Sequence, residues 1–460
     1  MDLKKSLLKI FTVNFFQLIA NLIVGFIVPM ILSIEDYANL KTYTLLISYI
    51  GFFHFGFVDG LFIKYGGKKY EEIDMSTLKG EHNFLFFMEL IITGVFLIIS
   101  FLNKNLVLFL FSITILPEIF KSFYKNIYQA TGEFRKYSIL MYTYIFSYLS
   151  FNILFALILR LNNYIYYCLV NLISNFIAMF LFEIKFLKYT SKIQATIRIN
   201  ILENIKIGFF ILLGNVALIM LYGIDKWFVK LFLSVDEFAY YSFAVSMLNI
   251  VNVLMNAISI TFYNYLFKNN STKKIIKLRK YLIVLGSFAS CSFFILKFII
   301  TSFIYKYILS LSIISIIFAI FPYMAIINSL YINLYKVNKR EKKYFKVILL
   351  ILIISIIYNV VALLIFHNTS SIAISTLLTM LTWLIYSTHD LSLNHNSLSM
   401  YIYLGLITIV FIVSANFFNW SVGLIVYAIF VTLLTCVFYK DVIYDIYIIF
   451  VNLIRRKKYE

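Results

Sequence analysis

Long apolar runs separated by short polar connectors repeat from one end of the chain to the other. Most runs hold about 20 residues, the length that an α-helix needs to cross the hydrocarbon core of a bilayer. No connector is long enough to hold an inserted soluble domain. The pattern predicts an all-α polytopic membrane protein with about fourteen transmembrane helices, expected at 10–32, 41–63, 83–101, 105–128, 138–159, 164–182, 207–232, 240–266, 281–303, 308–335, 345–366, 371–388, 401–418 and 421–439.

The chain also repeats itself in two halves. The connector SIEDYA at 33–38 returns as SVDEFA at 234–239, and at the same shift of 201 residues Asn14 falls on Asn215. The basic loops at 127–138 and 334–345 match at a slightly larger shift, and Pro117 and Pro322 fall in corresponding spans as the expected helix-interior prolines. Composition alone explains matched Leu and Val, but not matched polar loops and prolines in the same order.

The repeat predicts two parallel six-helix lobes at 1–200 and 201–390, followed by two further helices and a tail at 391–460. Parallel halves related by an axis along the membrane normal are a transporter architecture, in which the substrate site lies between the halves near the midplane. The tail KDVIYDIYIIFVNLIRRKKYE is amphipathic and too polar for a fifteenth span. We expect it to lie on the membrane surface.

Composition and charge agree with this picture. The chain is 62% hydrophobic and 13% charged, about half the charge of a soluble domain. With the N-terminus inside, most of the 40 Lys and Arg residues fall in cytoplasmic connectors or at the cytoplasmic ends of spans, which is the positive-inside pattern, and Lys226, Lys230 and Lys297 stand out as lysines within spans. The net charge of +19 then reflects the membrane topology and does not indicate nucleic-acid binding. Both termini are predicted to be cytoplasmic.

Polar side chains inside the expected spans form stripes at helical spacing. Charged and amide groups in hydrocarbon usually face a bundle interior or a watery cavity, although amides also serve as hydrogen bonds between helices. Lys226 is the favoured cavity-facing cation, and Lys230, nearer the surface, is expected to snorkel. The candidate substrate-cavity residues are Asn14, Gln17, Asn21, Lys64, Asn215, Tyr222, Asp225, Lys226, Asn249, Asn252, Asn256 and Lys297.

A second set of polar residues offers candidates for ion coupling: His54, Asp59, Glu89 and Glu118. A carboxylate in a span can partner a cation or carry a proton. A lone histidine on an apolar face is more often a hydrogen-bonded core residue than a proton relay, and both interpretations of His54 stay open.

The sequence offers no site for an enzyme. There is no GxxxxGK[ST] phosphate loop, no GxSxG nucleophile and no His/Cys/carboxylate cluster at metal-ligand spacing. Cys168, Cys291 and Cys436 are isolated in apolar runs. We expect neither catalysis nor a cofactor nor a bound metal.

The opening "N…GFIVPMILSIEDYANLKTY", the segment "GFFHFGFVDG" and their counterparts from Asn215 through "SVDEFAYY", together with the six-plus-six-plus-two pattern, resemble the polysaccharide-transport branch of the MOP exporter superfamily. That branch includes O-antigen flippases of the Wzx type and has a fold like that of MATE transporters. The resemblance covers the whole chain by pattern more than by a diagnostic motif. The cationic cavity expected for the branch has few candidate lysines here.

The resemblance implies a flippase of the bacterial inner membrane in lipopolysaccharide or other surface-polysaccharide biosynthesis. It would move undecaprenyl-diphosphate-linked oligosaccharide repeat units from the cytoplasmic to the periplasmic leaflet by alternating access. Membrane lipid, and the polymerase and chain-length machinery of the same pathway, are the implied partners. A cation-coupled multidrug exporter or a peptidoglycan-precursor flippase of the same fold stays open. An oligosaccharide polymerase is disfavoured because every outer connector is short.

Overall fold

A computed structural model describes residues 3–196, 200–250, 271–394 and 397–445 of the 460-residue chain. These residues are almost entirely helical and contain no strand. Eleven helices are long and apolar enough to cross a membrane, or up to thirteen if each of two bent helix pairs counts as one span. The expected span 240–266 and the tail lie largely outside the described residues. The protein is a multi-pass membrane protein, as the sequence predicts.

The helices pack into two compact units, Met1–Gly223 and Ile224–Glu460. The division lies after Gly223, whereas the second half of the sequence repeat begins near residue 201. The domain boundaries expected from the repeat, after residues 200 and 390, stay a prediction. The first unit contains α1 (Leu3–Ile31), α2 (Ile34–Ile47), η1 (Ile50–Phe52), α3 (Phe57–Tyr65), η2 (Tyr70–Glu72), α4 (Met75–Leu102), α5 (Leu106–Ala130), α6 (Phe134–Ile153), η3 (Leu154–Ile158), α7 (Tyr164–Tyr189) and α8 (Ile201–Leu221).

The second unit begins with α9 (Ile224–Phe232) and a helical stretch at 235–250. It continues with α11 (Thr272–Ala289), α12 (Ser292–Phe303), η4 (Tyr305–Tyr307), α13 (Ser310–Phe318), α14 (Phe321–Ile326), η5 (Ile327–Tyr331), α15 (Ile332–Val337), α16 (Glu341–Phe366), α17 (Thr369–Asp390), α18 (Ser397–Phe417) and α19 (Trp420–Phe438).

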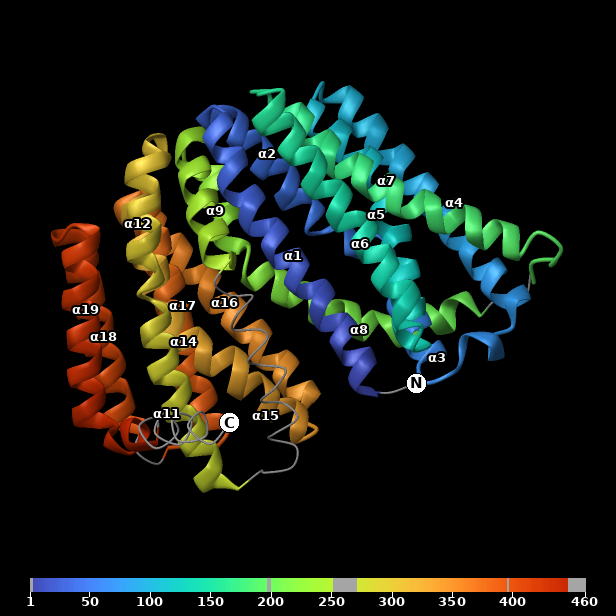
Figure 1. Ribbon diagram of the computed structural model, residues 1–460. Coiled ribbons are helices and arrows are strands. Elements are labelled where there is room, and N and C mark those ends of the chain that lie inside the picture. Colours follow the sequence, from blue (N-terminus) through green and yellow to red (C-terminus); the bar gives the residue numbers. More distant parts are fainter. Residues whose placement is uncertain (1–2, 197–199, 251–270, 395–396, 446–460) are drawn as a thin grey trace, which may run out of the picture. The chain divides into compact units, whose positions relative to one another are not determined.

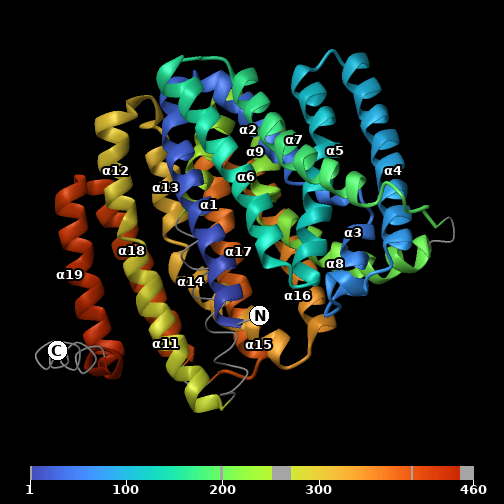
Figure 2. The same ribbon diagram turned by 45° about the vertical axis from the view of Figure 1, so that its right-hand side comes forward.

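Helices pack side by side within each unit. In the first, α5 packs against α4, α6 and α7, and α1 packs against α6 (Figure 1 and Figure 2). In the second, α16 pairs with α17 and α18 with α19 (Figure 1). Large apolar side chains such as Leu102 and Leu364 remain about four-fifths exposed, which is the expected state of a surface that faces lipid tails and not water.

The repeated connector is explained by two helix caps. Ser33 begins α2, and its Oγ accepts the Asp36 N–H at 3.0 Å. Ser234 precedes the helix at 235–250, and its Oγ accepts the Glu237 N–H at 3.3 Å, while Glu237 accepts the Ser234 N–H in return. The pattern Ser-x-x-acid occurs twice because a helix start needs a side-chain acceptor for its unpaired N–H groups.

Three expected spans are interrupted instead of continuous. Ile34–Phe52 and Phe57–Tyr65 meet at 55° where 41–63 was expected, and Ser310–Phe318 and Phe321–Val337 meet at 41° where 308–335 was expected. The first break carries Phe55 and Gly56 in left-handed conformations, and the second precedes Pro322, which lacks an N–H. The expected span 207–232 ends at Leu221 and restarts as α9.

The prolines also differ from expectation. Pro117 lies inside the unbroken α5, and Pro29 lies inside α1 near its end. Pro322 stands at the start of α14, where the missing N–H would have had no helical partner. The expectation that Pro117 and Pro322 alone occupy helix interiors is therefore wrong, because a helix that starts at a break accepts proline in its first turn.

A polar cavity in the first unit

A continuous polar stripe runs along α5 inside the membrane span Leu106–Ala130. Five polar residues stand at positions i, i+3, i+4, i+7 and i+8, which places them on one face of the helix: Glu118, Lys121, Ser122, Lys125 and Asn126. Lys121 is buried and Lys125 half-buried. Because two lysines in a span are costly in hydrocarbon, this face must meet polar partners or water.

The C-terminal half of this stripe borders a cavity of about 530 Å³ that lies between three segments of the first unit. The segment from η1 to α3 forms one wall, α5 the second and α8 the third. The cavity is lined by Ser48, Gly51, Phe52, His54, Asp59, Ser122, Lys125, Asn126, Leu212, Asn215, Val216, Leu218 and Ile219. It brings a cation, a carboxylate, an imidazole, two amides and two hydroxyls together.

His54 and Asp59 form the polar part of the first wall. The His54 ring is buried, and its Nδ1 accepts the Gly56 N–H at 3.1 Å. This bond places the ring proton of neutral His54 on Nε2, which lies 4.0 Å from Asp59 Oδ2. Lys125 faces the same space from α5. The cavity wall therefore offers both signs of charge, with hydrogen-bond donors and acceptors between them.

The other end of the α5 stripe is satisfied within the helix bundle. Lys121 Nζ lies 2.8 Å from Glu118 Oε1 and 3.9 Å from the centroid of the Tyr144 ring. A cation held by a carboxylate and an aromatic face is well compensated for its loss of water. Glu118, a candidate for ion coupling, is thus the partner of Lys121.

A close helix crossing seals the cavity wall between α3 and α8. Added Cβ atoms on Gly56 would lie 2.6 Å from the Phe209 nitrogen, and those on Gly60 and Gly208 would overlap backbone atoms of the facing helix. Beside the crossing, fully buried Glu81 binds the Tyr65 hydroxyl at 2.6 Å and the Asn204 amide at 3.0 Å, and also pairs with Lys64. Lys64 is therefore an ion-pair partner and does not line the cavity.

The remaining candidates of the first unit are dispersed. On α1, Asn14 and Asn21 are exposed, and Gln17 Nε2 donates to Asn21 Oδ1 at 3.1 Å. Glu89 is fully buried on α4, and neither carboxyl oxygen has a hydrogen-bond partner among the described residues. Tyr222 is half-buried just after α8. Of the predicted residues that the structure describes, His54, Asp59 and Asn215 line the cavity.

In the second unit, Asp225 is the centre of a buried cluster. It accepts the Tyr241 hydroxyl at 2.7 Å, the Thr376 hydroxyl at 3.5 Å and the Lys226 backbone N–H at 2.8 Å. The cluster ties α9 to the helix at 235–250 and to α17. Lys226 itself is half-buried, Asn249 is exposed, and Asn252 and Asn256 lie outside the described residues.

Lys297 has a structural partner that the sequence did not suggest. Its Nζ donates to the carbonyl oxygens of Ala415 and Phe418, each at 2.7 Å, at the C-terminal end of α18. A cation at a helix C-terminus satisfies unpaired carbonyls and complements the helix dipole. Lys297 thus caps α18 in this structure, and its assignment to a substrate cavity stays a prediction.

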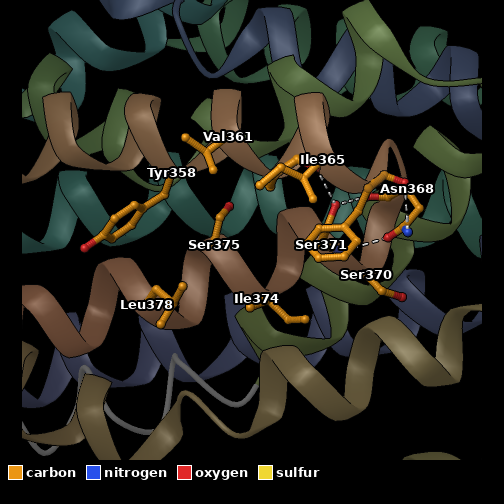
Figure 3. Close-up of a pocket in the computed structure, with 11 residues that line it drawn as sticks. Tyr358, Val361, Ile365, Asn368, Ser370, Ser371, Ile374, Ser375 and Leu378 are labelled. Carbon is orange, nitrogen blue, oxygen red and sulfur yellow. Dashed lines mark hydrogen bonds between the residues drawn. The ribbon is translucent and has the colours of Figure 1, made fainter.

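A second pocket of about 300 Å³ lies between α16 and α17 (Figure 3). Figure 3 shows apolar Val361, Ile365 and Ile374 along its length, and Asn368 and Ser371 at one end. There the Asn368 side chain accepts the Ser371 N–H at 2.8 Å, so that end is a helix cap. The pocket is an apolar crevice between two spans and contains no charged lining residue.

Sequence reasoning missed the two lysines of α5. The expected span 105–128 contains both, but they lie near its cytoplasmic end and were not selected as candidate cavity residues. The period of Glu118, Lys121, Ser122, Lys125 and Asn126 could have placed them on one helix face. No group of three or more His, Cys, Asp or Glu residues able to hold a metal exists in the part of the chain that the structure describes.

Comparisons with known proteins extend the fold assignment. No protein-family model matches the chain, and no curated protein matches its sequence. Among solved structures, the lipid II flippase MurJ in an inward closed conformation matches with a TM-score of 0.70 and 14% identity, covering 94% of this chain and 99% of that chain. At this identity the likeness shows the fold. The chain has an all-helical, MurJ-like fold.

Proposed function

We propose that this protein is a flippase of the MOP superfamily that moves an undecaprenyl-diphosphate-linked oligosaccharide from the cytoplasmic to the periplasmic leaflet of a bacterial inner membrane. The MurJ-like fold supports a lipid-linked substrate, because MurJ is a lipid II flippase. The resemblance of the repeated connectors to polysaccharide transporters supports an oligosaccharide repeat unit. The six-plus-six-plus-two organisation supports alternating access between two lobes.

The observation that carries the proposal is the polar cavity beside α5. A diphosphate needs a cation and N–H donors, and Lys125 and Asn126 supply them from adjacent positions of one helix. Sugar hydroxyls need groups that donate and accept, which Ser122, Asn215 and Asp59 provide. The cavity lies within the span region, while the lipid tail would remain in the bilayer.

A peptidoglycan-precursor flippase is the second candidate, and the likeness to MurJ is the specific observation that favours it. Its substrate shares the polyprenyl diphosphate and differs in the attached sugar-peptide. The cavity chemistry at Lys125 would serve both substrates. The two candidates predict different intermediates when the protein is absent.

The test is depletion of the protein followed by analysis of lipid-linked sugars on each leaflet. We expect single repeat units on undecaprenyl diphosphate to accumulate at the cytoplasmic face while surface polysaccharide disappears and cells remain intact. Accumulation of lipid II with cell lysis would establish the peptidoglycan candidate instead. Unchanged leaflet distributions of both lipids would contradict a lipid-linked substrate.

Complementation tests the cavity. Lys125→Ala should reduce translocation at least about tenfold, the equivalent of one lost charge-assisted hydrogen bond, and Lys125→Arg should retain most of it. Lys206→Ala is the matched control, because Lys206 is exposed on α8 and does not line the cavity. Equal translocation by Lys125→Ala and wild type, at equal protein level, would remove Lys125 from the site.

A further inference from the structure

His54 occupies the break in the second expected span, where the chain turns through 55° between Ile34–Phe52 and Phe57–Tyr65. The turn is made by two consecutive left-handed residues, Phe55 at φ 46° and Gly56 at φ 84°. Left-handed backbone is strained for a bulky residue such as Phe and persists only when neighbouring contacts hold it. The contact made by a side chain of the turn itself is the bond from the Gly56 N–H to His54 Nδ1, 3.1 Å long.

This bond exists only when His54 is neutral. Imidazole Nδ1 accepts a hydrogen bond through its lone pair, and protonation replaces that lone pair with a second N–H. The protonated ring would then direct an N–H at the Gly56 N–H, and two donors repel. A proton on His54 Nδ1 and the bond from the Gly56 N–H therefore exclude each other.

The turn also sets the wall of the cavity. Gly56 packs directly on the backbone of Gly208 and Phe209 in α8. One and two turns further along α8, Leu212, Asn215 and Val216 line the cavity together with His54. Release of the turn would therefore loosen the α3–α8 crossing and open the wall at these residues.

Two groups of opposite charge face the space around His54. Asp59 on α3 places Oδ2 4.0 Å from His54 Nε2 and would receive the imidazolium, and Lys125 faces the same space from α5. The α8 wall presents Asn215 and apolar side chains. From α4, Phe84 and Phe96 contact the rings of Phe57 and Phe53, and Glu89 lies between them in sequence.

Two further charged pairs lie on the elements around the turn. Lys64 on α3 pairs with Glu81 on α4, and Glu118 pairs with Lys121 on α5. In each pair the two charges compensate each other. Neither makes a hydrogen bond or ion pair with His54 among the described residues. The proton-dependent contact of the turn is thus the one between His54 and Gly56.

We propose that His54 is the proton-binding residue that couples the cavity to a proton: its neutral form holds the turn at Phe55–Gly56, and protonation releases the turn and opens the α3–α8 wall. The proposal names the coupling ion of the proposed flippase and rests on it for the link to transport. The behaviour of the turn needs no substrate, so it can be tested separately.

The experiment follows the reactivity of a buried cysteine in the cavity wall. The full-length protein, with Cys168, Cys291 and Cys436 replaced by Ser and Val216 by Cys, is reconstituted in lipid nanodiscs. Labelling by a water-soluble methanethiosulfonate, corrected for the pH dependence of a small thiol, is measured from about pH 8 to about pH 4.5, a range that spans histidine titration. Val216 is 7% exposed, so release of the wall should raise its labelling rate about tenfold, the equivalent of one lost hydrogen bond.

Two variants of His54 separate the proton from the hydrogen bond. In His54→Asn the amide oxygen can accept the Gly56 N–H in an Asx-type turn but cannot take up a proton near neutral pH, so labelling should stay low at every pH. In His54→Ala the acceptor is absent, so labelling should be high at every pH. A cysteine at Ile119, which is buried on α5 and does not line the cavity, serves as the control reporter and should stay unreactive throughout.

The proposal is overturned if His54→Asn retains the pH dependence of the parent, because the proton then binds elsewhere. It is also overturned if the parent shows no pH dependence while the protein remains folded. Should His54→Ala fail to fold, the comparison of parent and His54→Asn still decides. If labelling of the cavity wall depends on pH but the protein fails the lipid-translocation test, the proposed role of His54 stands and only the proposed substrate is refuted.

Discussion

At the scale of single residues, the lysines of the spanning helices differ in the partner that compensates each charge. Lys297 Nζ donates to two carbonyls at the end of α18, and Lys79 Nζ does the same for the Thr190 and Ile193 carbonyls after α7. Lys121 is held by Glu118 and Tyr144. Lys125 instead faces a cavity that contains more polar groups than it can bind at once, so it is the lysine suited to a ligand.

This difference predicts the effect of removing Lys297. Lys297→Ala should lower the free energy of unfolding in detergent by about 1–2 kcal/mol, because two carbonyls lose a cationic partner at a helix C-terminus, while translocation at a permissive temperature should not change. Thermal unfolding and the lipid assay measure the two effects. Lys104→Ala, in the exposed connection between α4 and α5, is the control. Lost translocation with unchanged stability would return Lys297 to a substrate role.

At the scale of elements, the crossing of α3 and α8 decides where the cavity ends. Gly56, Gly60 and Gly208 let two backbones touch, as small residues do at helix contacts inside membranes. Glu81 fixes the same crossing from α4 through Tyr65, Lys64 and Asn204. The cavity opens where this glycine contact stops and larger residues of α8 begin.

Gly208→Ala should therefore destabilise the protein more than an ordinary helix substitution. The new Cβ would collide with the Gly56 carbonyl, which is backbone and cannot rotate away, so we expect a loss of about 1–3 kcal/mol or failure to fold. Gly214→Ala on the same helix meets nothing within 4 Å and should be neutral or raise stability by up to about 1 kcal/mol. Equal melting temperatures for the two variants would show that α3 and α8 do not cross this closely.

At the scale of the whole molecule, the number of spans determines whether the two termini lie on the same side of the membrane. The described residues hold up to thirteen spans, and the expected span 240–266 would make fourteen, which would place both termini on one side. The basic connectors predict that this side is the cytoplasm.

Reporter insertions test this topology. Alkaline phosphatase inserted after Asn368, between α16 and α17, should be active because the connection is expected outside. The same insertion after Lys339, between α15 and α16, should be inactive, and a fluorescent protein fused after Glu460 should fluoresce. The reverse pattern at both insertions would invert the topology and with it the proposed direction of transport.

The sequence by itself determined the membrane class, the all-helical fold and most span positions. Hydropathy and helical period are local properties, and a bilayer forces every spanning segment to satisfy its own backbone. The repeated connectors at Ser33 and Ser234 could also be recognised from the sequence, because a helix cap depends on residues three positions apart. His54, Asp59 and Asn215 were identified as polar exceptions for the same local reason.

Only the tertiary structure decided which polar residues share a space. Asp59, Lys125 and Asn215 lie on three helices far apart in sequence, and their meeting depends on the close approach that the glycines of α3 and α8 permit. The break at Phe55–Gly56 was hidden because its apolar composition continues through the turn. The partner of Lys297 was hidden because the end of α18 lies 118 residues away. Composition shows that a charge is buried, whereas packing determines what compensates it.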